Sequence, residues 1–396
     1  MDLSETPEMA AFRGEVRGFL DARRDDYAQG AAKDVLAWQR ELIAAGYAAR
    51  TIPREYGGYG AQPDILRSRI IAEEFIAAGA PRGMAGQGIS MLVPTLLEVG
   101  SEEQKARWIG PTLRGEILWC QGYSEPGAGS DLANLQTKAV EDGNDFIISG
   151  SKIWTSTAHM AQMMFCLVRT EPQAAKHEGI SYMLFPMDTP GIEVRPLKTM
   201  TGGSEFNEVF FTDVKVPKTQ IVGARGQGWF VANATLKHER GMLGDPNAAH
   251  ARLQAIIEIL KTETLDGQRL MDHPLYLDRL MQLQARVIAM QANGLRLLTA
   301  AQRKEAPGMA GLIVKLQGCE LNHQLAALAI DALGELGVLY HGSPHQRAGG
   351  VWQHRYMFDL GLIIGGGTAQ IQKNIIAERG LGMPREPKLA PKSAKA

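Results

Sequence analysis

The spacing of the apolar residues changes twice along the chain, and this change limits the possible folds more than any other feature. Over residues 1–118 the spacing is helical, because apolar side chains recur every four positions at Phe12, Val16 and Leu20. A further helix is expected from Ser101, where Ser-Glu-Glu-Gln is typical of an N-cap followed by acidic first-turn residues. Residues 1–118 are therefore predicted to form a helical domain.

Over residues 119–226 the helical spacing gives way to short β-branched and aromatic runs separated by turn residues. The runs cover residues 146–148, 164–168, 182–185, 192–195 and 208–211. No helical pattern separates them, so they are not expected to form a parallel sheet with crossover helices. This part is predicted to be a β-barrel or β-sandwich domain.

Residues 227–383 return to helical spacing, with long apolar stripes and short connections. Three stripes are clear, over residues 253–260, 277–298 and 312–333. Long helices with short connections are typical of an antiparallel bundle, here predicted to be a four-helix bundle. The Pro-, Lys- and Ala-rich residues 384–396 are expected to form a disordered tail. The predicted fold class is thus α+β, in the order helical domain, β domain, helical bundle.

Charge and cysteine content exclude several classes of protein. The 42 basic and 43 acidic side chains leave a net charge of −1, which argues against nucleic-acid binding. Cys120, Cys166 and Cys319 are odd in number and far apart, so neither a disulfide framework nor a metal site is expected. No run approaches 18 apolar residues, and the first residues do not resemble a signal peptide, so we expect a cytoplasmic protein without a membrane span.

Three segments could carry chemistry. Glycines and hydroxyls in residues 122–131 could let a ligand approach the backbone closely, and a tryptophan among hydroxyl residues in 150–157 could stack on a planar heterocycle. Residues 363–372 contain a glycine cluster, but no strand is predicted before it, so a dinucleotide-binding loop is not indicated. Taken singly, the first two segments also fit an ordinary turn and a half-buried strand.

Together these segments resemble the acyl-CoA dehydrogenase family along essentially the whole chain. The resemblance rests on motifs in the family's order and spacing, at residues 123–131, 152–156, 208–217, 366–372 and 377–379. It implies the same order of helical, β and helical domains that the periodicity predicts. It also implies FAD as cofactor and an acyl-CoA thioester as substrate.

The resemblance assigns most of the FAD contacts to the β domain. The isoalloxazine and pyrophosphate would be lined by the glycine-rich segment, with Tyr123 and Ser124 offering backbone groups to the pyrimidine ring. Trp154 would lie against the flavin. Ser156, which is a threonine in most of the family, would form a hydrogen bond through its hydroxyl near N5 of the flavin. The residues implied in this region are Gln121, Tyr123, Ser124, Gly129, Ser130, Trp154, Thr155 and Ser156.

The adenine end of FAD would be completed by a neighbouring subunit. The implied residues are Asp331, Gly334, Thr368 and Gln370. The segment 331–335 carries two carboxylates that the family motif lacks, and these would repel a pyrophosphate unless they point away. Residues 264–267 stand where the family has an arginine, but they contain none.

The catalytic base is the clearest departure from the common family pattern. Many members have a glutamate where this chain has Gly366, and glycine cannot accept a proton. A subset, the isovaleryl- and long-chain-type enzymes, takes its base from a bundle helix just before an arginine, which maps onto Glu239 and Arg240. His238 is a competing base, but a helix turns about 100° per residue, so His238 and Glu239 cannot face the flavin together.

The implied reaction removes the α-proton with Glu239 while the β-hydride passes to FAD, giving a trans-2-enoyl-CoA. Substrate contacts are expected from Ser130, Arg240, Gly366 and Gly367. Electrons would pass to an electron-transfer flavoprotein, and the chain is expected to form a homodimer or homotetramer in fatty-acid or lipid metabolism. Two alternatives stay open: a non-catalytic partner subunit of a hetero-oligomer, and a flavin oxidase or monooxygenase on the same fold. The acyl group is not predicted.

Overall fold

The computed structural model describes residues 6–28, 31–242, 246–303, 305–340 and 342–385. The chain divides into two compact units, Met1–Glu239 and Arg240–Ala396, which are described separately. The predicted disordered tail lies, from residue 386 onward, outside the described residues.

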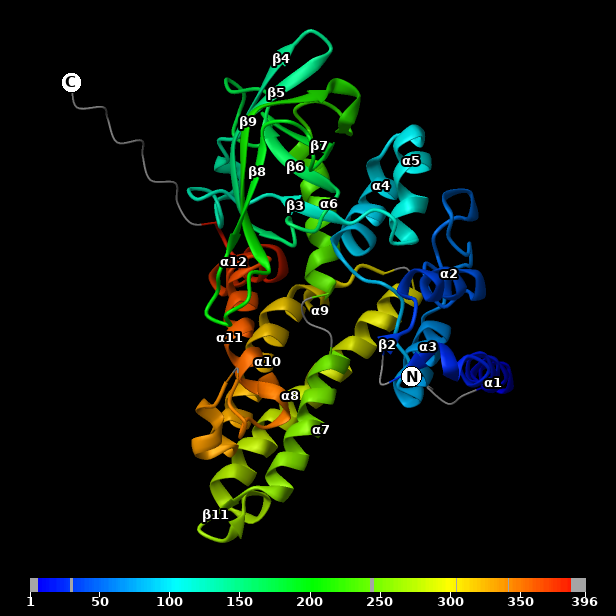
Figure 1. The fold of residues 1–396 in the computed structure, drawn as a ribbon, viewed down its shortest axis with the longest axis vertical. Helices are drawn as coiled ribbons and strands as arrows, with labels where there is room; N and C mark the ends of the chain where they lie inside the picture. Colours follow the sequence, from blue (N-terminus) through cyan, green and yellow to red (C-terminus); the bar gives the residue numbers. More distant parts are fainter. Residues whose placement is uncertain (1–5, 29–30, 243–245, 304, 341, 386–396) are drawn as a thin grey trace, which may run out of the picture. The chain divides into compact units, whose positions relative to one another are not determined.

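In its described residues, the first unit begins with five α-helices (Figure 1), and all of them except the fourth start at a side-chain N-cap. Ser101 accepts a hydrogen bond from the Gln104 amide, and the Gln104 side chain accepts one from the Ser101 amide, so the predicted helix start is confirmed as a capping box. A π-helical turn, Gly88–Leu92, leads directly into the fourth helix. The helices are α1 (Pro7–Asp21), α2 (Val35–Ala45), α3 (Ile65–Ala78), α4 (Val93–Val99) and α5 (Glu102–Leu113).

The β domain follows and contains an eight-stranded sheet with the order β10-β7-β6-β4-β5-β9-β8 and with β3 beside β6 (Figure 1). All pairs are antiparallel except β3–β6 and β4–β6, and β5 pairs with β9 along almost its whole length. The predicted β runs are confirmed within these strands. The strands are β3 (Trp119–Gly122), β4 (Lys138–Asp142), β5 (Asp145–Ser156), β6 (Met163–Arg169), β7 (Ile180–Pro186), β8 (Ile192–Leu197), β9 (Phe206–Pro217) and β10 (Ile221–Val222).

Helix α6 (Gly228–Met242) returns the chain to helical structure, and most of it packs within the first unit. Val231, Ala232 and Thr235 are buried on one side of it. Val231 and Ala232 belong to a core that also includes Leu96 of α4 and Tyr182 of β7. Helix α6 therefore presents one face to both the helices and the sheet of this unit.

The second unit is a bundle in which α7, α8 and α11 all pack against α10. Its core is aliphatic, with fully buried Leu321, Leu325 and Leu328 on α10 and Trp352 on α11. The predicted third stripe is divided at Ile313 into a short helix and a long one. The helices are α7 (Pro246–Thr262), α8 (Pro274–Gln302), α9 (Gly308–Leu312), α10 (Val314–Ala332), α11 (Val351–Ile364) and α12 (Ala369–Ile375).

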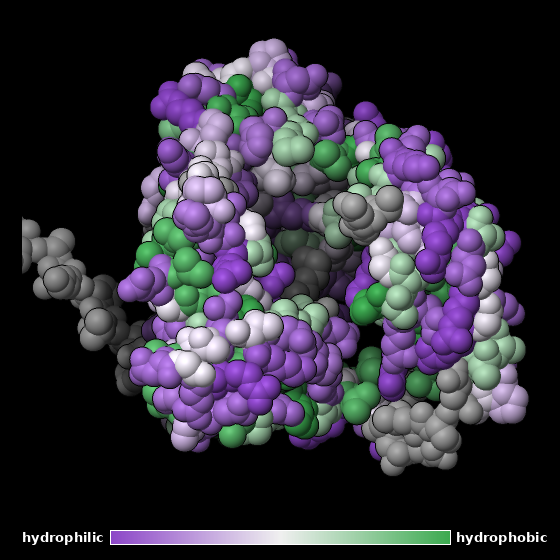
Figure 2. Space-filling model, turned by 60° about the horizontal axis from the view of Figure 1, so that its bottom comes forward, coloured by the Kyte–Doolittle hydropathy of each residue, from purple (hydrophilic) through white to green (hydrophobic). Residues whose placement is uncertain are grey.

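The order helical domain, β domain, helical domain is confirmed. On the face shown in Figure 2, hydrophilic side chains are interspersed with hydrophobic ones. None of the helices in the described ranges is long and apolar enough to cross a membrane.

Candidate active site

The glycine-rich segment that follows β3 is fixed at one end and open at the other. Tyr123 is buried in the core, and the Ser124 carbonyl accepts a hydrogen bond of 2.8 Å from the Ile153 amide of β5. Nothing lies within 4 Å of the position that a Cβ would take on Gly129, which is exposed together with Ser130. A ligand could therefore reach the backbone of this segment directly.

Strand β5 carries the tryptophan and the hydroxyl residues of the second motif. Trp154 has a left-handed φ of 60°, at a break in the pairing of β5 with β9, and it is 58% exposed. Its ring contacts Phe206 edge-on, with ring centroids 6.1 Å apart. The Thr155 hydroxyl is buried and has no hydrogen-bond partner in the described part of the chain, whereas Ser156 is partly exposed. An exposed aromatic ring held in a strained conformation beside an unpaired hydroxyl fits a planar cofactor with polar edges.

The predicted base lies on the inner face of α6. Glu239 follows Thr235 by four residues and Val231 by eight, so all three belong to one face of the helix. Burial raises the pKa of Tyr123 well above its usual value, and the nearby Tyr182 and the Glu239 carboxylate also raise it. Glu239 thus lies near the segment to which the isoalloxazine was assigned. It is partly buried, as a base shielded from water should be.

The competing base points elsewhere. His238 Nε2 lies 3.0 Å from Glu98 Oε1, so its ring is paired with a carboxylate beside α4. The side chain of Arg240 lies outside the part of the chain that the structure describes.

The terminal glycine motif forms a turn between α11 and α12. Gly366 and Gly367 have φ values of 65° and 94°, which other residues rarely adopt. The Lys315 ammonium is buried and donates to the Ile363 and Gly367 carbonyls, at 2.8 and 2.6 Å. Sequence reasoning overlooked Lys315, although a lysine within an apolar helical stripe is a recognisable signal.

The two predicted FAD residues beside this turn have different environments. The Thr368 hydroxyl caps α12 by accepting the Ile371 amide at 3.2 Å, so one of its lone pairs is already used. Gln370 is exposed on the first turn of α12. Gln372, which was not predicted, donates to the Gly366 carbonyl at 3.0 Å and helps to fix the turn.

The carboxylate of Asp331 is neutralised within the bundle. Arg279 Nη2 lies 2.7 Å from Asp331 Oδ2, so the repulsion expected between Asp331 and a pyrophosphate is reduced. Gly334 is exposed with a φ of 53°. The segment without the family's arginine forms a hairpin of β11 (Thr264–Leu265) and β12 (Gln268–Arg269).

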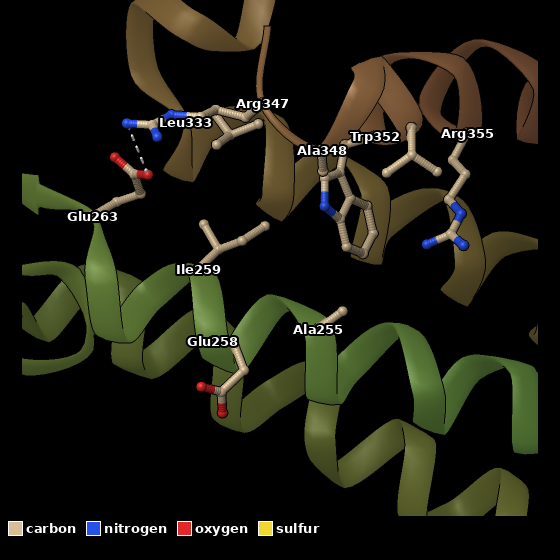
Figure 3. A pocket seen from close by; sticks show the side chains of 10 residues that line it. Ala255, Glu258, Ile259, Glu263, Leu333, Arg347, Ala348, Trp352 and Arg355 are labelled. Atoms are coloured by element: carbon tan, nitrogen blue, oxygen red, sulfur yellow. Dashed lines mark ion pairs between the residues drawn. The ribbon is translucent and has the colours of Figure 1, made fainter. Parts of the chain in front are cut away.

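A pocket of about 490 Å³ lies in this unit between α7 and α11 (Figure 3). Its centre is apolar, and Figure 3 shows Ile259 facing the ring of Trp352 there. At one end Arg347 pairs with Glu263 at 3.8 Å, and at the other Arg355 stacks on Trp352, with its guanidinium 5.0 Å from the ring centroid. The pocket could hold a flat group with a nearby negative charge.

Arg355 gives this pocket a positive charge that no carboxylate in the described residues neutralises directly. Burial lowers the pKa of Arg355, the nearby Arg252 lowers it further, and Asp359 opposes both effects. Asp359 is bound instead by Arg252. The pocket includes Leu333, from the segment predicted to meet the adenine end of FAD.

Metal and thiol chemistry find no support in the described residues. No group of three or more His, Cys, Asp or Glu side chains there could hold a metal ion. Burial raises the pKa of Cys120, Cys166 and Cys319, which disfavours reactive thiolates.

Comparison with known proteins identifies the class to which this fold and these motifs belong. Residues 6–116, 120–214 and 226–381 match the family profiles of the acyl-CoA dehydrogenase N-terminal, middle and C-terminal domains. The chain belongs to the acyl-CoA dehydrogenase family and is an enzyme of that family.

Individual relatives give a more detailed likeness. Acyl-CoA dehydrogenase IpdE1 of Mycobacterium tuberculosis is 37% identical, over 96% of this chain and 99% of the relative. The structure of the ChsE4–ChsE5 complex from the same species is 31% identical, with a TM-score of 0.80 over 98% of this chain and 100% of that chain. The Tcur3481–Tcur3483 steroid ACAD is 29% identical, with a TM-score of 0.80 and the same coverage.

Proposed function

We propose that this chain binds FAD and catalyses the α,β-dehydrogenation of an acyl-CoA thioester to the trans-2-enoyl-CoA, with Glu239 as the base. The observation that carries this proposal is the position of Glu239 near Tyr123, on the same face of α6 as the buried Thr235. Gly366 has no side chain to serve as a base, and His238 is paired with Glu98.

The residues of the first unit fit the β-domain half of FAD. Trp154 supplies an exposed ring, and Thr155 supplies a buried hydroxyl without a partner in the described ranges. Tyr123 and Ser124 would present backbone groups to the pyrimidine ring, and Ser156 would bond near N5. Gly129 leaves room for phosphate oxygens to approach the backbone, with Ser130 beside it. When bound, FAD supplies the acceptor for the β-hydride.

Glu239 would remove the α-proton of the thioester. An apolar acyl group that closes over the site would exclude water from Glu239 and raise its pKa toward the working pH. Backbone amide donors at the thioester oxygen would stabilise the charge that develops as the proton leaves. We assign the neighbouring substrate contacts to Ser130, Arg240, Gly366 and Gly367.

The test is a comparison of Glu239→Gln with His238→Gln in anaerobic rapid mixing with acyl-CoA, followed by the loss of flavin absorbance. Glu239→Gln keeps the size of the side chain and should still bind FAD. Its flavin reduction should be slower by about 10²–10⁴-fold, the usual contribution of a positioned base. His238→Gln should stay close to wild type. Wild-type rates in Glu239→Gln would refute the assignment of the base.

We further propose that the pocket of Figure 3 receives the adenine end of FAD from a second copy of the chain. The apolar centre of the pocket could receive the adenine, and the positive charges of Arg347 and Arg355 could replace the arginine missing from residues 264–267. We also assign Asp331, Gly334, Thr368 and Gln370 to this end of the cofactor. A homodimer or homotetramer follows, with two-fold symmetry, and a flavin-loaded monomer in light scattering would refute it.

A second candidate is a subunit that needs a different partner chain. It is favoured by the absence of a side chain at Gly366 and by the likeness to the ChsE4–ChsE5 complex, whose name joins two chains. The chain purified alone decides between the candidates, because an active enzyme is yellow and is bleached by acyl-CoA. A substrate panel should include steroid acyl-CoA thioesters, since one similar structure is a steroid ACAD. Reoxidation by an electron-transfer flavoprotein, with little reaction with oxygen, would exclude an oxidase.

A further inference from the structure

A fully buried ion pair joins the two segments of the β domain to which the flavin is assigned. Lys152 of β5 has no exposed side-chain surface, and the Glu125 side chain is 7% exposed. Lys152 Nζ lies 2.8 Å from Glu125 Oε1 and also donates to the Tyr123 carbonyl at 3.2 Å. The lysine therefore holds both ends of the short stretch that contains Ser124.

The carboxylate of Glu125 accepts hydrogen bonds from three donors. Besides Lys152 it accepts the backbone amides of Gln136 and Thr137, at 2.5 and 2.9 Å. Burial by itself would raise the pKa of Glu125, but Lys152 and the amides hold it below its usual range, so the carboxyl group is ionised at neutral pH. The network is thus fully formed inside the protein, where a charge without a partner would be costly.

The two residues of the pair are close in sequence to the proposed flavin contacts. Trp154 is two residues beyond Lys152, and the Ile153 amide between them donates to the Ser124 carbonyl at 2.8 Å. Any shift of Lys152 would therefore move the tryptophan relative to residues 123–125. An apolar pair of the same size could fill the space, but it could not fix the direction of the Tyr123 carbonyl.

We propose that Glu125 and Lys152 are positioning residues for FAD, which set the spacing and orientation of the glycine-rich segment relative to Trp154. The inference rests on the proposed function, since it requires that these two segments bind the flavin. It assigns to the ion pair a role in cofactor geometry in addition to its role in packing.

The test compares Lys152→Met, the double variant Lys152→Met/Glu125→Leu and a control, each purified and stripped of flavin. The control is Lys176→Met. Lys176 Nζ lies 2.5 Å from Asp131 Oδ2, at the end of the glycine-rich segment, and both side chains of this ion pair are exposed to solvent. FAD affinity is measured by quenching of flavin fluorescence, flavin geometry by visible circular dichroism and folding by thermal unfolding. The double variant leaves no unpaired buried charge, so it should fold even if Lys152→Met does not.

We expect the double variant to fold with a lower melting temperature, because the Gln136 and Thr137 amides lose their acceptor, while its FAD affinity falls by at least tenfold and its visible circular dichroism changes. Lys176→Met should match wild type in all three measurements. A double variant with both wild-type affinity and wild-type dichroism would overturn the positioning role and leave the proposed function intact. A wild-type protein that binds no FAD would overturn the proposed function and this inference together.

Discussion

The substitution Thr235→Val tests the buried hydroxyl cluster beside the proposed base. The Thr235 hydroxyl lies 3.0 Å from Thr95 Oγ1 of α4 and 3.2 Å from the Val231 carbonyl, and it has no exposed surface. The hydroxyls of Tyr123 and Tyr182 are buried nearby, and neither has a hydrogen-bond partner in the described residues. Valine keeps the shape of the side chain and removes only its polar group.

The expected cost follows from these contacts. Loss of the bond to Thr95 costs about 1 kcal/mol net, because Thr95 keeps its bond of 2.7 Å to the Met91 carbonyl. The two tyrosine hydroxyls lose a polar neighbour, which brings the expected total to about 1–3 kcal/mol. For a unit of this size, each kcal/mol lowers the melting temperature by about 2–4 °C.

Differential scanning calorimetry on flavin-free protein measures the effect. The matched control is Thr262→Val, since Thr262 makes the same kind of bond to the carbonyl four residues earlier, at 3.1 Å, but is exposed. We expect the control to change stability by less than about 0.5 kcal/mol. Equal melting temperatures for the two variants would show that the hydroxyl cluster does not stabilise the contact of α6 with α4.

Three further predictions concern the terminal turn and the acid stability of the first unit. Lys315→Met should lower the free energy of unfolding by about 1–3 kcal/mol, because two carbonyls lose a buried donor. The control Lys373→Met, on the exposed surface of α12, should leave the free energy of unfolding unchanged. Gly366→Ala should lower the free energy of unfolding by about 1–2 kcal/mol, because Gly366 has a left-handed φ of 65°. The measurement is the melting temperature, and an unchanged melting temperature would contradict the left-handed conformation of this turn. The pKa of Glu125 is lowered in the folded state, so its contribution to stability is complete above about pH 4.3 and is lost as the pH falls through the folded pKa. Glu125→Gln should therefore weaken the acid dependence of the melting temperature between about pH 5 and pH 2, and an unchanged slope would count against the ion pair.

Local signals in the sequence predicted much of the secondary structure. The helix beginning at Ser101 is an example, because an N-cap and its first turn involve neighbouring residues only. The β runs were equally clear, since their β-branched and aromatic composition and their flanking turn residues are also local. The positions of Trp154 and Gly366 in motifs were likewise readable, but their left-handed φ values were not.

Contacts between distant residues were beyond sequence reasoning. Glu125 and Lys152 are 27 residues apart, and nothing in either motif alone indicates that one neutralises the other. The pairing of His238 with Glu98 is a similar case, because the two residues are 140 positions apart along the chain.

The sequence by itself determined the order of helical and β segments and, through motifs at fixed spacing, the family of the protein. These features depend on short-range periodicity and on residue identity, which the chain carries wherever it folds. Only the tertiary structure decided which charges are neutralised: Asp331 by Arg279 and Glu125 by Lys152. The energy of a charge depends on its distance to other charges and on its exposure to water, and both are set when separate segments pack together.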